Sequence, residues 1–155
     1  MSLTNTLIGQ YDHCWRMLEN GIGICTEDQW KHVIDDPFFV PCRVAFHIIQ
    51  SADYYAGVEA ADFNWAEFGF DWEEAPTEQF PNKADTIAYL ERVKEKVSAF
   101  IESKGNETLI GSDEAFSPRF ESPFARMLYG LRHSHHHIGQ LSLDLQRRGL
   151  PEISW

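Results

Sequence analysis

The sequence LRHSHHHIGQL, residues 131–141, contains four of the chain's seven histidines and decides how the rest is interpreted. It lies inside a segment that we predict to be helical from about Ser122 to Arg147, because apolar residues recur there at intervals of three and four. Each residue of an α-helix turns by about 100°, so His133 and His137 project about 40° apart, one turn above the other. His136 is expected to face water. The stretch therefore aligns two imidazoles on one side of a long helix.

An apolar stripe runs along the same predicted helix, and the two aligned histidines flank it. Such a stripe packs against a core, which places His133 and His137 at the core's edge. Two histidines at positions i and i+4 are a common way for one helix to bind a transition metal. A polar histidine edge without metal is the alternative interpretation. The stripe comprises Phe124, Met127, Leu128, Leu131, Ile138, Leu141 and Leu145.

Length, charge and cysteine usage exclude several classes of protein. The 155 residues suffice for a sizeable core, and we expect a single domain over residues 1–155. The net charge of −11 disfavours nucleic acid and anionic membrane as partners, since the 13 Lys and Arg residues form no basic patch. No apolar run approaches the roughly 20 residues that span a bilayer, and no signal-peptide pattern is present, which predicts a cytoplasmic protein. The three cysteines lack CxxC spacing, so neither a disulfide framework nor a zinc knuckle is expected.

Three further amphipathic helices are predicted before the histidine-rich one. The first covers about residues 3–20 and ends at Gly21-Ile22-Gly23, and the second begins at Pro41 and ends near Gly57 or Ala60. The third covers about residues 82–103, with Asn82 as its candidate N-cap and the sequence from Lys104 to Asn106 as its stop. Strand signals are weak throughout. The pattern therefore predicts an all-α four-helix bundle.

The connection over residues 61–81, between the second and third predicted helices, is unusually long. It contains six aromatic and six acidic residues. Connections of this length in a compact domain cross the fold or line a site, and aromatic side chains are costly to leave in water. We expect this segment to pack across the bundle and to let the second and third helices run parallel.

A metal bound by His133 and His137 needs a third ligand, and His47 is the best candidate. It is the only other histidine placed in the middle of a predicted helix beside an apolar stripe. His13 is expected either at the surface or in the core with its hydrogen bonds satisfied, and His32 lies in a connection. Three neutral imidazoles with an open position form a catalytic type of metal site.

A carboxylate or a carbonyl group is the expected partner of each histidine's other ring nitrogen, because such a partner fixes the orientation of a metal ligand. Asp53, Asp144 and the acidic residues of the 61–81 connection are candidates, and the sequence does not choose among them.

His47 on the second helix and the H-x3-H-x-G-Q string of residues 133–140 together resemble the DinB-like superfamily. Members carry one histidine on helix two and this string on the terminal helix, and the resemblance covers essentially the whole chain. It implies a bundle of up-down-down-up topology with a long crossover between helices two and three. It also implies a divalent metal, zinc or nickel, bound by His47, His133 and His137, and often a homodimer.

Two residues after the last histidine take roles from the same resemblance. Gly139 would allow close helix packing, and Gln140 would brace a neighbouring helix; both are expected to support the metal ligands or the structure around them.

Relatives in that superfamily include metal-dependent transferases and isomerases that use thiols such as bacillithiol, mycothiol or glutathione. The resemblance therefore implies a thiol S-transferase or isomerase with a small-molecule substrate, and the aromatic residues of the 61–81 connection would line its pocket. Two alternatives stay open. One is metal-assisted hydrolysis with Glu59 or Asp53 as the base. The other is a protein without turnover that binds a metal or a small molecule.

Overall fold

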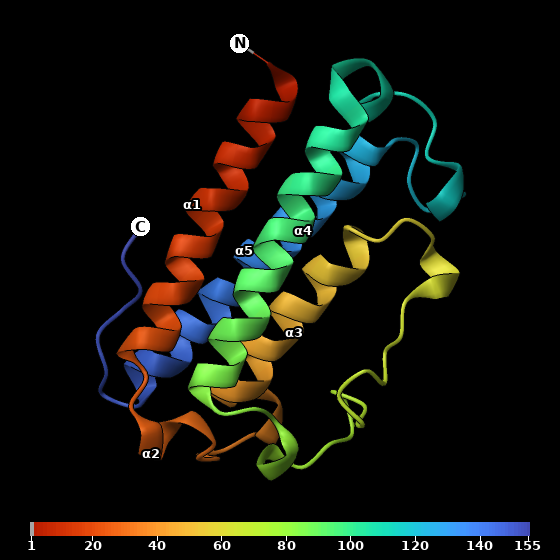
Figure 1. Ribbon diagram of the computed structural model, residues 1–155. Helices are drawn as coiled ribbons and strands as arrows, with labels where there is room; N and C mark the ends of the chain where they lie inside the picture. Colours follow the sequence, from red (N-terminus) through yellow and green to blue (C-terminus); the bar gives the residue numbers. More distant parts are fainter. Residues whose placement is uncertain (1) are drawn as a thin grey trace.

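Four long helices make up the architecture of the computed structural model, which describes residues 2–155 (Figure 1). These are α1 (Leu3–Ile24), α3 (Pro41–Tyr55), α4 (Lys83–Leu109) and α5 (Pro123–Arg147). No strand occurs in residues 2–155, so the predicted all-α class is confirmed. The connections hold the short helix α2 (Glu27–Trp30) and the 3-10 turns η1 (Pro37–Phe39), η2 (Ala60–Asp62), η3 (Thr77–Gln79) and η4 (Glu114–Phe116).

Capping groups and prolines set the starts of three of these helices. The Ala125 amide donates to Ser122 Oγ at 3.1 Å at the start of α5, and the Asp85 amide donates to Asn82 Oδ1 at 2.9 Å at the start of α4. Each such cap contributes about 1 kcal/mol. Pro41 occupies the first turn of α3, where its missing N–H costs nothing.

The long helices form a four-sided bundle. α3 packs against α4 and α5, and α1 packs against the same two helices. In Figure 1, α1 and α5 run downward and α3 and α4 run upward, so α3 faces an antiparallel partner in α5. The chain between α3 and α4 returns along the outside of the bundle (Figure 1). The predicted second and last helices are therefore neighbours.

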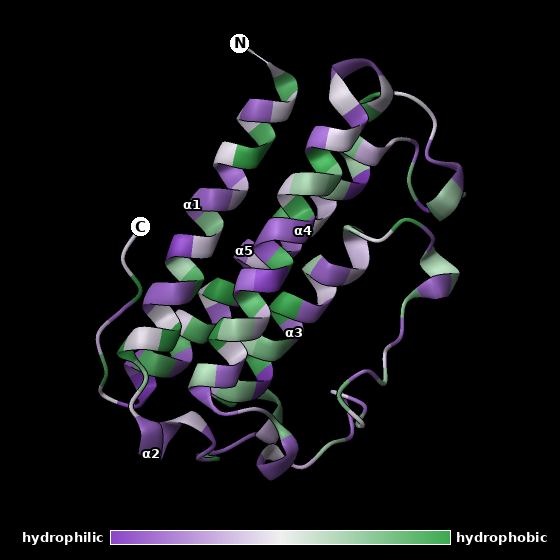
Figure 2. Cartoon of the chain, viewed as in Figure 1, coloured by the Kyte–Doolittle hydropathy of each residue, from purple (hydrophilic) through white to green (hydrophobic). Residues whose placement is uncertain are grey.

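The core is built from the inner faces of all four long helices. Hydrophilic and hydrophobic residues alternate along each of them in Figure 2, as amphipathic helices require. No helix of the described residues is long and apolar enough to cross a membrane. Leu128, predicted in the apolar stripe of the last helix, is 48% exposed, so the stripe is narrower than expected. The fully buried core side chains include Trp15, Leu18, Ile22, Phe46, Ile49, Leu90, Val97, Ile101, Met127, Ile138, Leu141 and Leu145.

Two predicted helix ends differ from the structure. α1 continues through Gly21 to Ile24. Gly21 makes room for a packing partner rather than ending the helix, since a Cβ there would lie 2.6 Å from Ile153 Cδ1. α4 is interrupted as predicted at Gly105, whose φ of 61° lies in the left-handed region, but one more helical turn follows to Leu109.

The 61–81 connection packs onto the bundle as predicted. The ring of Phe46 on α3 lies 5.0 Å from Phe68, 5.2 Å from Phe70 and 5.5 Å from Phe80 between centroids. Such aromatic pairs contribute about 0.5–1.5 kcal/mol beyond their buried area. Trp65 is 46% exposed, so not every aromatic side chain of the segment is covered.

A buried ion pair ties the connection between α4 and α5 to the bundle. Arg126 Nε lies 2.8 Å from Asp113 Oδ2, and the two residues are 1% and 5% exposed. Arg126 also donates to the carbonyl oxygen of Gly57 at 2.8 Å, just beyond α3. One side chain therefore joins α5, the 110–122 connection and the end of α3.

The Arg126→Ala variant is expected to lower the free energy of unfolding by about 3–5 kcal/mol, because it leaves the Asp113 carboxylate buried without its partner. Urea unfolding followed by circular dichroism measures this change. Arg132→Ala, at an exposed position on the same helix, is the control and should change stability by less than about 0.5 kcal/mol. Equal stabilities of the two variants would contradict a structural role for the pair.

Candidate metal centre

The imidazole rings of His47, His133 and His137 converge where α3 and α5 face each other. His133 Nε2 lies 3.3 Å from His47 Nε2 and 3.2 Å from His137 Nε2. One ligand atom from each of the three side chains falls within 4.8 Å of the others, and all three side chains are half-buried. The fold thus brings together the three histidines that the sequence singled out.

The separations of these nitrogens fit a metal ion. Three imidazoles bound tetrahedrally at about 2.0–2.1 Å hold their nitrogens about 3.3 Å apart. Without a metal, a proton on His133 Nε2 could be donated to only one of the two nitrogens that lie within reach. A cation at the centre would give all three nitrogens a partner at once. His47, His133 and His137 are therefore positioned to bind a metal ion.

Close contact between α3 and α5 begins at Gly130, less than one turn before His133. A Cβ atom at Gly130 would lie 2.9 Å from Tyr11 Oη and 3.2 Å from Tyr55 Cδ2, so a larger residue would push the helices apart. Tyr11 Oη also donates to the Met127 carbonyl at 2.6 Å, which fixes α1 to the same point. His47 lies about two turns before Tyr55 on the antiparallel helix and therefore reaches the histidines of α5.

Gln140 orients one of the three imidazoles. Its Oε1 lies 2.6 Å from Nδ1 of His137. Because a carbonyl oxygen only accepts, the Nδ1 of His137 carries the proton and its Nε2 presents a lone pair to the centre. Metal-binding histidines usually donate their second N–H in this way.

Gln140 supports a candidate metal ligand, and Gly139 lies at the surface. The Gln140 side chain contacts a histidine of its own helix, and no hydrogen bond joins it to another helix within residues 2–155. Gly139 is exposed, and a Cβ placed there would meet nothing within 4 Å, so it permits no close packing within this chain. The glycine that does so is Gly130.

The carboxylates expected beside the histidines have other partners. Asp53 accepts a hydrogen bond from Tyr89 Oη at 2.8 Å and forms an ion pair with Lys96. Asp144 accepts from Arg148 Nε at 2.6 Å. Neither contacts the triad, which is instead surrounded by aromatic rings and Gln140.

Aromatic rings pack on two of the histidines. The Trp72 ring lies on His47, with centroids 3.8 Å apart and planes inclined by 31°. The Tyr55 and Tyr129 rings both lie 6.3 Å from the His133 ring. These contacts hold the imidazoles in place and exclude water from one side of each.

Burial and mutual proximity keep the histidines neutral. Burial, followed by the charges of the neighbouring His137 and His133, lowers the pKa of His47 to about 3. Burial, followed by the charge of His137, lowers the pKa of His133 to about 4. Burial also lowers the pKa of His137. Neutral imidazole is the form that binds a metal.

A cavity of about 170 Å³ opens beside His47 and His137. Of the aromatic residues in the 61–81 connection, only Trp72 lines it. Phe38 and Phe39 of η1 supply two further aromatic walls. The remaining lining residues are Arg43, Val44 and Gln140.

Arg43 holds two of these walls together. The residue is 3% exposed, and its guanidinium donates to the carbonyl oxygens of Trp72, Glu73 and Ala75, and to that of Pro37 at 2.9 Å. Among the described residues no carboxylate lies within ion-pair distance of it. Its hydrogen bonds thus fix both the loop that carries Trp72 and the turn that carries Phe38.

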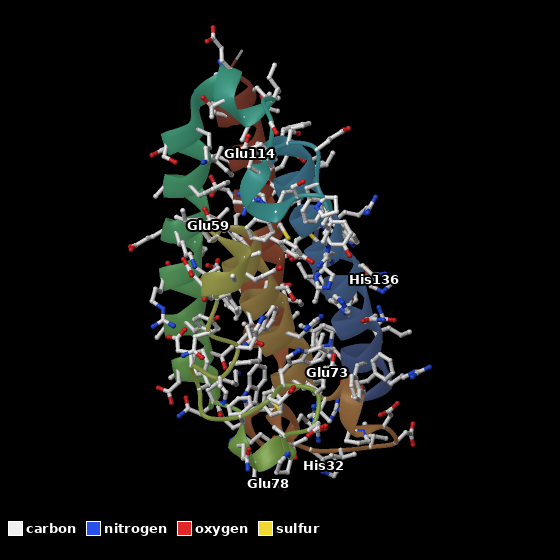
Figure 3. The ribbon with its side chains drawn as sticks, turned by 90° about the vertical axis from the view of Figure 1, so that its right-hand side faces the viewer. His32, Glu59, Glu73, Glu78, Glu114 and His136 are labelled. Atoms are coloured by element: carbon white, nitrogen blue, oxygen red, sulfur yellow. The ribbon has the colours of Figure 1, made fainter. Side chains whose placement is uncertain are left out.

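The remaining histidines lie outside the triad. His13 contacts Arg16 at 3.4 Å, and His135 stacks near Trp155 with ring centroids 6.4 Å apart. His32 is exposed, and His136 projects outward from α5 (Figure 3).

Sequence reasoning missed Phe38, Phe39 and Arg43. A pair of phenylalanines directly after Asp36-Pro37, in a connection between helices, was the available signal for the first two. An arginine in the apolar first turns of a helix was the signal for Arg43, since a buried guanidinium requires several acceptors.

The sequence model of the DinB superfamily matches residues 10–141. No curated protein matches the chain. The family match includes His47, His133, His137 and Gln140, and it confirms the resemblance drawn from them. The chain belongs to the DinB superfamily.

Replacing Gln140 by leucine is expected to weaken zinc binding about 10- to 100-fold, because His137 loses the acceptor that fixes its ring. Competition with a chromophoric chelator at pH 7.5 measures the dissociation constant. His13→Ala, which removes an exposed imidazole on α1 away from the triad, should leave the constant unchanged. Equal affinities in all three proteins would show that Gln140 plays no such part.

The metal-free protein should lose stability below about pH 6.5 because of His47. The pKa of His47 is lower in the folded protein than in the unfolded chain. At pH 5 His47 is therefore protonated in the unfolded state and neutral in the folded state. The free energy of unfolding then falls by about 2 kcal/mol from this residue. Urea unfolding at pH 7.5 and pH 5 tests this. The His47→Gln variant should show a pH dependence smaller by about that amount, and identical dependences would contradict the depressed pKa.

Proposed function

We propose that this member of the DinB superfamily is a metal-dependent enzyme that uses a low-molecular-weight thiol, as an S-transferase or isomerase of small molecules. His47, His133 and His137 would hold one divalent metal, zinc or nickel. The observation that carries the proposal is the convergence of three Nε2 atoms, 3.2 and 3.3 Å apart, at the edge of a cavity. A half-buried centre with room beside it suits a ligand that binds and leaves.

A metal at this centre would lower the pKa of a bound thiol, so that the thiolate form is available at neutral pH. Three residues around the triad shape this centre. Gln140 directs the lone pair of His137 Nε2 to the centre. Trp72 covers the face of His47 and excludes water from it. Arg43 holds Trp72 there.

The hydrolase alternative has less support, because it needs a carboxylate base beside the centre. None of the residues lining the cavity is Asp or Glu. Asp53 is engaged by Tyr89 and Lys96, and Glu59 is exposed at the start of η2. The alternative without turnover shares the same metal ligands and differs only in the absence of a reaction.

The proposal is tested with zinc- and nickel-loaded protein, prepared without an affinity tag and supplied with glutathione, cysteine or bacillithiol and an electrophile such as 1-chloro-2,4-dinitrobenzene. We expect formation of the S-conjugate at a rate at least 100-fold above that of His133→Ala. His13→Ala, at an exposed position on α1, is the matched control and should retain the parent rate.

Three other outcomes would contradict the proposal. Equal rates in the parent and His133→Ala would assign the reaction to solution. Ester hydrolysis without any thiol would support the hydrolase. Metal binding without turnover of any electrophile would leave the non-catalytic alternative.

A further inference from the structure

Two adjoining hollows run from the histidine triad along the surface of α5. The first is the cavity of about 170 Å³ beside His47 and His137. The second, of about 290 Å³, is lined by Phe39, Gln140, Leu143, Asp144 and Arg147. Both share Phe39 and Gln140, so they form one depression, which we call the Phe39 groove.

Exposed apolar side chains gather at this groove. Phe38, Phe39 and Leu143 are 45%, 42% and 52% exposed. Val33 and Ile34, which precede η1 in the same connection, are 37% and 46% exposed. Apolar residues left exposed together beside a cavity mark a binding site, since their contact with water is unfavourable.

The charged groups of the groove are almost all engaged. Arg43 donates to four backbone carbonyl groups, and Asp144 is paired with Arg148. Arg147, at the far end, is exposed. A charged group placed in the first hollow would lose its water without gaining a partner there, so the walls select an apolar occupant.

We propose that the molecule used at the triad carries an apolar alkyl or aryl group, which fills the first hollow and continues over Leu143. A cavity of about 150 Å³ accommodates one benzene ring, so the first hollow takes a six-membered ring or a short alkyl chain. The part of the apolar group that extends beyond the first hollow lies in the second. The inference rests on the proposed function, because it names the substrate class of the same centre.

Alkanethiols of different length test the groove on cobalt-substituted protein, in which thiolate coordination gives a charge-transfer absorption. Each fully buried CH₂ group strengthens binding about fourfold. With partial burial, hexanethiol should bind at least tenfold more tightly than ethanethiol. Cysteamine, whose short chain ends in a cation, should bind no more tightly than ethanethiol.

Two leucines on α5 provide matched variants. Leu143→Ala should weaken binding of hexanethiol about fivefold and leave that of ethanethiol unchanged. Leu128, 48% exposed and outside both hollows, is the control, and Leu128→Ala should change neither affinity. Equal binding of ethanethiol and hexanethiol, or equal effects of the two variants, would overturn the inference.

Metal-free protein separates this inference from the proposed function. There, 1-hexanol should shift the nuclear magnetic resonance signal of the Trp72 indole N–H, with weaker binding in Leu143→Ala. If hexanol binds in this way while loaded protein coordinates no thiol, the groove stands and the proposed function fails. If metal-loaded protein coordinates thiols regardless of their chain length and hexanol does not bind, the inference about the Phe39 groove is wrong while the proposed function is still supported.

Discussion

The close approach of α3 and α5 at Gly130 is the contact on which the site depends. Tyr55 of α3 and Tyr11 of α1 both occupy the space that a side chain at this position would fill. With the helices at this distance, one histidine of α3 reaches two of α5, and the three Nε2 atoms come within 3.3 Å of their nearest neighbour. A wider separation would leave three half-buried histidines with no common centre. Packing of small and aromatic residues thus determines whether the polar groups can act together.

A second constraint comes from Arg43, a charged group inside the fold. Taking a guanidinium out of water is costly unless its donors are satisfied. Here four backbone carbonyl groups, from Pro37, Trp72, Glu73 and Ala75, satisfy them. Three of these carbonyls belong to the 61–81 connection and one to the 3-10 turn η1, so the arginine joins two segments that no helix pairing connects. It fixes the two loops that form the walls beside the triad, and the shape of the cavity follows from it.

The sequence predicted those parts of the molecule that depend on local periodicity. The four helices, the cap at Asn82, the break at Gly105 and the alignment of His133 with His137 all follow from spacing along one chain segment. The choice of His47 needed the additional expectation that flanks of packed helices meet. Contacts between loops were not predictable in this way: Phe38 and Arg43 act through segments whose path no periodicity describes. A carboxylate or a carbonyl acceptor was expected for the second ring nitrogen of each histidine, but spacing alone could not choose among the candidates. For His137 the acceptor is the side-chain carbonyl of Gln140, three residues away.

X-ray absorption spectroscopy of zinc-loaded protein tests the central claim, that three imidazoles form one metal centre. The account predicts three nitrogen neighbours at about 2.0–2.1 Å with imidazole scattering, and two in the His137→Ala variant. No sulfur neighbour is expected before thiol is added, because the cluster of potential ligands in the described residues holds three histidines and no cysteine. Sulfur in the first shell of the untreated protein, or a spectrum that His137→Ala leaves unchanged, would contradict it.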